Sequence, residues 1–258
     1  MSASRSFAPC LLAVLLWAAA PLACARADQR EEFLAGRVKD CAGCDLAGAN
    51  FKRRDLSGAD LTGANLRHAN FHDARLVGAR LAGADLGDAN LNKANLSRAD
   101  LAGAKLREAM LYGTVLDAAR LTGADFTEAL MGTARFLRAD LTKATLRNAD
   151  MRKTRLDGAV LDGADLTGAA LDEALLRDTR LDRAVLAGAR LLGADLTGAK
   201  LAGADMRDAD ARRANLRGAD LTGASLAEAN LRQANLYEAK IDGAAFRDTT
   251  MPDGTKTP

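Results

Sequence analysis

Residues 84–103 read ADLGD-ANLNK-ANLSR-ADLAG, and each group of five opens with an alanine, a polar residue and a leucine. The pattern runs without insertion or deletion from Leu46 to Phe246, which gives 41 consecutive apolar centres. Leu occupies 31 of these centres, and Phe, Met or Ile fill nine. Two residues before the centre, a second position holds Ala in 36 of 41 repeats. Any fold of this chain has to accommodate this period of five.

A five-residue period fits neither regular secondary structure. On an α-helix five residues advance about 500°, so the leucines would drift about 140° around the helix with each repeat. On a flat strand the period is odd, so successive leucines would point to opposite faces. Short extended sides joined by bends solve the problem, because Ala and Leu two residues apart then share one inward face. Glycines such as Gly58 and Gly63, two residues after a centre, indicate bends that need positive φ. We therefore predict an all-β solenoid.

The number of sides in each coil comes from a resemblance. The tandem A(D/N)LXX pattern, as in residues 59–63 and 194–198 (both ADLTG), resembles the pentapeptide-repeat family. That resemblance implies a right-handed quadrilateral parallel β-helix with four repeats in each coil. Residues 45–250 would then form about ten coils and a rod about 50 Å long.

Both ends of such a rod need protection, because an open coil presents unpaired backbone groups. We expect residues 28–44 to form an N-terminal cap, with a short amphipathic capping helix whose apolar side chains cover the first coil (Phe33, Leu34 and Val38). Arg54, which stands in an inward position near this end, is expected to reach solvent. The tail, residues 251–258, is expected to close the last coil together with Phe246.

Residues 1–27 have the features of a secretory signal peptide. Arg5 precedes a short apolar run over residues 10–20, and Ala25-Arg26-Ala27 offers a cleavage site. We predict cleavage after Ala27 and a periplasmic or secreted mature chain without a membrane span. The run is shorter than the about 20 residues that a membrane-spanning helix needs. An uncleaved anchor and lipidation of Cys24 remain alternatives.

The motif that most resembles a chemical site is Cys41-x-x-Cys44. In the repeat register Cys41 is a centre and Cys44 occupies the alanine position, so both should face inward. A zinc site would need four ligands, and a thioredoxin-type site would need a βαβ context. We therefore expect a local disulfide or buried thiols. His68 and His72 face outward on adjacent sides and do not form a metal site alone, so no cofactor or metal is expected.

The outer surface of the rod is where a binding function would lie. The net charge is +2, from 36 basic and 34 acidic residues, which disfavours a nucleic-acid ligand. We name the four faces A to D after their first centres, Leu46, Phe51, Leu56 and Leu61. Face A sums to about −5 and face B to about +4. A candidate interaction patch lies at mid-rod, where apolar residues replace the usual polar ones (Met110, Tyr112, Leu130 and, on the next face, Leu137).

These features predict a non-catalytic, exported protein that acts as a structural or protein-interaction scaffold in the bacterial envelope. Its partner would be a protein of unknown identity, and a homodimer is one form of that interaction. Some proteins of the family that the chain resembles imitate DNA and bind type II topoisomerases. The near-neutral charge and the signal peptide disfavour that alternative here. No arrangement of residues typical of an enzyme is recognisable.

Overall fold

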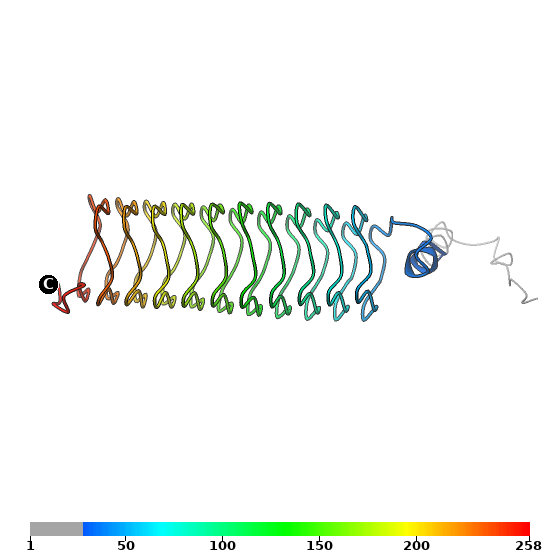
Figure 1. Ribbon diagram of the computed structural model, residues 1–258, viewed down its shortest axis with the longest axis horizontal. Coiled ribbons are helices and arrows are strands. Elements are labelled where there is room, and N and C mark those ends of the chain that lie inside the picture. Colours follow the sequence, from blue (N-terminus) through cyan, green and yellow to red (C-terminus); the bar gives the residue numbers. More distant parts are fainter. Residues whose placement is uncertain (1–27) are drawn as a thin grey trace, which may run out of the picture.

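A computed structural model describes residues 28–258, most of which form a stack of coils in a straight rod (Figure 1). Parallel bridges join residues 20 apart, from Asp40–Asp60 at one end to Asn230–Thr250 at the other. Each coil therefore has four sides of five residues. Each side contributes one bridged residue, the one before the apolar centre, so residues 28–258 contain isolated bridges rather than continuous strands.

The side centred on Leu66 shows how one coil binds the next. The N–H of Leu66 donates to the carbonyl of Asp85 at 2.7 Å, and the N–H of Asp85 donates to the carbonyl of Ala64 at 2.9 Å. The N–H of Ala69 closes the following turn by donating to the carbonyl of Leu66 at 3.0 Å. Because these bonds recur from coil to coil, the backbone pairs with itself along the rod.

Every turn after a centre has a left-handed residue at its second central position. Glycine fills this position in 18 of the 41 turns, as predicted, and another residue fills it in 23. The latter include Lys93, Arg98 and Glu128, with φ between 58° and 61°. Positive φ at this position alone is typical of a type II turn. The stacking of coils therefore imposes on many L-residues a conformation that they rarely adopt by themselves.

The interior is a column of leucine and alanine side chains with little or no exposure, as in Leu101 (0%) and Ala99 (1%). Three alanine positions hold threonine instead, namely Thr114, Thr154 and Thr179, and all three are fully buried. Each of these hydroxyls donates to a backbone carbonyl at 2.7–2.9 Å. Since a buried hydroxyl without a partner destabilises a fold, these bonds explain why threonine is tolerated there.

The N-terminal end of the rod contacts a helix over residues 28–34 (Figure 1). Phe33 is fully buried, and its ring packs edge-on against Phe51 with 5.8 Å between centroids. Leu34 packs partly against the core, whereas Val38 lies beyond the helix and is 39% exposed, so its predicted covering role is wrong. The helix thus protects the first coil mainly through one aromatic side chain.

Arg54 does not reach freely into solvent as predicted. Its guanidinium donates to the carbonyls of Leu34 at 2.9 Å and Phe33 at 3.2 Å, at the end of the helix. It also lies 5.5 Å from the centroid of the Phe51 ring. A cation is favourable at the C-terminus of a helix, where carbonyls lack intrahelical partners. The one charged residue in an inward position therefore joins the helix to the first coil.

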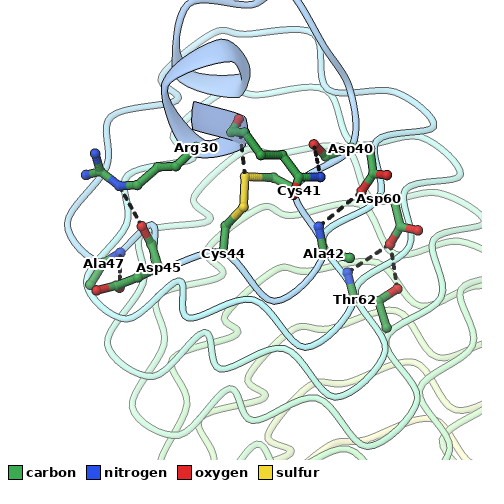
Figure 2. Close-up of a disulfide and its surroundings, with 10 residues drawn as sticks. Arg30, Asp40, Cys41, Ala42, Cys44, Asp45, Ala47, Asp60 and Thr62 are labelled. Atoms are coloured by element: carbon green, nitrogen blue, oxygen red, sulfur yellow. Dashed lines mark hydrogen bonds between the residues drawn. A yellow bond between two sulfur atoms is a disulfide. The ribbon is translucent and has the colours of Figure 1, made fainter. Parts of the chain in front are cut away.

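A disulfide joins Cys41 and Cys44 across the first turn of the rod, with 5.3 Å between the Cα atoms. Figure 2 shows it beneath the helix, between the side chains of Arg30 and Asp60. Both cysteines face inward, with 0% and 2% exposure. The side chain of Arg30 donates to the carbonyl of Asp45 at 2.7 Å, which adds a second contact between the helix and this coil.

The C-terminal end of the rod is less protected. Residues 253–258 turn back, with an antiparallel bridge between Thr250 and Lys256. Ile241, an apolar centre of the last coil, is 46% exposed, and Leu236 and Phe246 are half-buried. The tail therefore covers only part of the last coil, which is less than we predicted.

The predicted signal peptide and Cys24 lie in residues 1–27, outside the described part of the chain. Across residues 28–258, no helix combines the length and the apolar character that crossing a membrane requires.

Candidate functional site

The predicted apolar patch lies mainly on face B, in a shallow depression of about 480 Å³. Met110, Tyr112 and Leu130 all line it. Tyr112 is 57% exposed and Leu130 is 52% exposed, whereas Met110 is partly buried. Leu137 is not part of this depression, because it lines a separate groove on face C. The structure therefore brings together three of the four predicted residues.

The stacking of coils positions the three side chains. Met110 and Leu130 are bridged to each other as residues 20 apart, so they are neighbours in one column along the rod. The N–H of Tyr112 donates to Asn92 Oδ1 of the preceding coil at 2.8 Å. The Tyr112 ring lies over Gly132 of the following coil, whose absent Cβ would stand 3.5 Å from Tyr112 Cδ2. A larger residue than alanine at Gly132 would therefore compete with the ring for space.

Thr133 borders the same depression and is locally unusual. It has φ of 60°, and it is the β-branched member of the 23 non-glycine residues in left-handed turns of the described chain. Left-handed backbone is least favourable for β-branched residues. Strained residues are concentrated at binding and active sites, so this position supports a role for the depression.

The rim of the depression is charged. Arg152 donates to both carboxylate oxygens of Asp150, at 2.8 Å and 2.5 Å, and these bonds hold the pKa of Asp150 below its ordinary value. Lys153 lies 3.5 Å from Glu173. The floor is apolar and the rim polar, which is the usual composition of a small protein-binding surface.

Sequence reasoning missed Asn92, Gly132 and Thr133 as parts of this site. Asn92, Tyr112, Gly132 and Arg152 stand at intervals of 20, in the column of residues that follow the centres. The division of the sequence into four faces already aligns these residues in one column of face B, but nothing in the sequence shows that they border a depression. The strain at Thr133 has no signature in the sequence beyond the absence of glycine at that turn.

The other candidate residues do not form a chemical site. The Cys41–Cys44 disulfide is buried beneath the helix. His68 lies on the surface 3.9 Å from Asp88, and His72 lies on the adjacent side. Across residues 28–258, no group of three or more His, Cys, Asp or Glu side chains is arranged to hold a metal ion.

Comparison with known proteins identifies the family. The family profile described as pentapeptide repeats matches most of the rod (residues 44–81, 79–117, 119–158, 139–178, 179–218 and 214–251). No curated protein sequence matches the chain. The chain is similar to the crystal structure of HetL, a pentapeptide repeat protein involved in heterocyst differentiation regulation in the cyanobacterium Nostoc sp. strain PCC 7120. The two are 33% identical over 90% of this chain and 98% of HetL, with a TM-score of 0.66.

Another similar structure is QnrB1, a plasmid-mediated fluoroquinolone resistance protein. It is 19% identical over 76% of this chain and 88% of its own, with a TM-score of 0.48. The profile and the likeness to HetL, together with the 20-residue ladder of bridges, confirm the predicted relationship and the β-helix. The chain belongs to the pentapeptide-repeat family.

Proposed function

We propose that this chain is a non-catalytic, exported scaffold of the bacterial envelope that binds a protein partner through the depression on face B. The observation that carries the proposal is the grouping of exposed Tyr112 and Leu130 with the partly buried Met110 in one depression of the rod. Exposed aromatic and apolar side chains grouped in a depression are typical of protein-binding sites. Export is supported by the signal-peptide features of residues 1–27.

The form of the rod suits a scaffold. Its surface is built from stacked turns that interact mainly with neighbouring coils, so substitutions on one face leave the core unchanged. The helix over residues 28–34, with Phe33 buried, would act as the cap of the first coil. We expect the occupant to insert an apolar side chain between Tyr112 and Leu130.

The binding test compares variants that retain the repeat. Asp or Asn is the usual residue before a centre, so Leu130→Asp restores the consensus and should fold. Tyr112→Ala removes the exposed ring. Tyr237→Ala is the matched control, because Tyr237 occupies the same turn position on another face and is 64% exposed. Affinity capture from periplasmic extract with the mature chain should recover a partner that both patch variants lose and the control retains.

A partner recovered equally by all three variants would contradict the assignment of the patch. Sedimentation of the purified chain identifies the case in which the partner is a second copy, since Tyr112→Ala would then weaken self-association. Export is tested separately, by N-terminal sequencing of protein from the periplasm. Recovery of the chain in the cytoplasm with its first 27 residues intact would contradict export.

A further inference from the structure

Face C carries a second surface feature, separate from the patch. A groove of about 640 Å³ is lined by the residues that follow six successive centres (Val77, Ser97, Asp117, Leu137, Asp157 and Arg177). Since these residues stand one coil apart, the groove runs along the rod for about 24 Å at a coil spacing of about 4.8 Å. An extended peptide of about seven residues has this length.

The lining of the groove has an excess of positive charge. Four arginines line it, namely Arg98, Arg138, Arg155 and Arg177, against two aspartates. Both aspartates already face an arginine: Asp117 lies 2.5 Å from Arg135, and Asp157 lies 3.7 Å from Arg155.

Two of the four arginines keep their charge available for a ligand. Arg177 lies 2.6 Å from Asp195, outside the groove. Arg98 and Arg138 are both exposed, and within residues 28–258 neither forms a salt bridge at 4.0 Å or less. These two guanidinium groups are therefore the natural contacts for an anionic partner.

The distance between Arg98 and Arg138 indicates how far apart two anionic groups of a ligand should be. The two arginines occupy the same turn position two coils apart, with Ala118 between them, so their backbones stand about 10 Å apart. Arg138 leans along the rod, with its Cγ 3.6 Å from where a Cβ on Gly158 would stand. In an extended chain, residues four apart share a face and are separated by about 13 Å, a span that the two arginine side chains can match because Arg138 leans away from Arg98. The half-buried Leu137, in the same coil as Arg138, supplies an apolar contact in the groove.

We propose that this groove binds an extended acidic segment of a protein, with two carboxylates four positions apart on one face and an apolar side chain midway between them on the same face. Each carboxylate would accept hydrogen bonds from Arg98 or Arg138, and the apolar side chain would contact Leu137. A guanidinium can bind a carboxylate through two parallel hydrogen bonds, which favours carboxylates as ligands. This inference does not rest on the proposed function, because the groove and the patch lie on different faces.

The test measures binding of a fluorescent octapeptide that has two glutamates four positions apart and a leucine midway between them. The double variant Arg98→Glu/Arg138→Glu should bind at least about tenfold more weakly, since each exposed pair changes from attraction to repulsion. The variant should fold, because Glu108 and Glu128 already occupy this turn position with φ of 56° and 60°. Arg213→Glu, at the same turn position on face B, is the matched control and should bind like the wild type.

Further outcomes support or overturn the proposal. The peptide with glutamines in place of its glutamates should lose binding to the same extent, and Tyr112→Ala should leave binding unchanged. Equal binding by the double variant, or no binding by the wild type, overturns the proposal. Displacement of the peptide by inorganic phosphate or by duplex DNA at equal concentration also overturns it, in favour of a small-anion or nucleic-acid site.

Discussion

Replacing Thr133 by glycine is expected to stabilise the rod. Thr133 has φ of 60° in a turn that 18 other repeats make with glycine. An L-residue in the left-handed region costs about 1–2 kcal/mol relative to glycine, with β-branched residues among the least favourable. Glycine loses more conformational entropy on folding, which offsets about 0.5–1 kcal/mol of this gain. The net expectation for Thr133→Gly is a gain of about 1 kcal/mol in the free energy of unfolding.

The assay is denaturation followed by circular dichroism. For a chain of this size, 1 kcal/mol corresponds to an increase in Tm of about 2–4 °C. Gly123→Thr is the matched reverse change, because Gly123 has φ of 66° and its added Cβ would meet no atom within 4 Å. It should lower stability by about the amount that Thr133→Gly adds.

The two variants together decide whether the reasoning holds. If Thr133→Gly leaves the Tm unchanged and Gly123→Thr also has no effect, the stacked turns do not carry the strain that φ implies. If only Thr133→Gly is neutral, the threonine side chain makes stabilising contacts that compensate. A more stable Thr133→Gly variant that no longer captures the partner would connect the strain to binding at the depression.

Three further predictions concern the ends and the acid stability of the rod. Arg54→Ala places the consensus alanine two residues before the centre Leu56, but it removes two hydrogen bonds to the helix. Amide hydrogen exchange over residues 28–46 should therefore accelerate. Unchanged exchange would argue against the proposed role of Arg54. The double variant Cys41→Leu/Cys44→Ala also restores the consensus and should lose about 2 kcal/mol or less, because the closed loop is short; a larger loss in urea denaturation would contradict this. Hydrogen bonds from the hydroxyl and the N–H of Thr62 lower the pKa of Asp60, so the ionised carboxylate stabilises the folded chain. This contribution is complete above the ordinary pKa of about 4 and is lost as the pH falls through the lowered pKa. Thr62→Val should therefore unfold at a higher pH in an acid titration, and an unchanged midpoint would exclude that contribution.

The candidate site was predictable only in part. Met110 and Leu130 deviate from the polar residue that usually precedes a centre, but Val115 and Leu175 deviate in the same way, so the repeat pattern alone does not single them out. The contact between Met110 and Leu130 depends on the 20-residue coil, which the family resemblance implies and the ladder of bridges confirms. The importance of a small residue at Gly132 follows only from the structure, in which the Tyr112 ring lies over it. Leu137 shows the limit of the approach, because an apolar side chain near the patch in the sequence lines a different groove.

The sequence by itself determined that the leucines and alanines face one interior. A period of five excludes a continuous helix or strand whatever the neighbours are, because that argument depends only on local backbone geometry. The tertiary structure decided which surface residues meet, since contacts between residues 20 apart exist only once a coil has closed. It also placed Arg54 against the helix carbonyls and imposed left-handed turns on 23 residues other than glycine. Local sequence predicts none of these, because the hydrogen bonds and packing that stabilise them come from neighbouring coils.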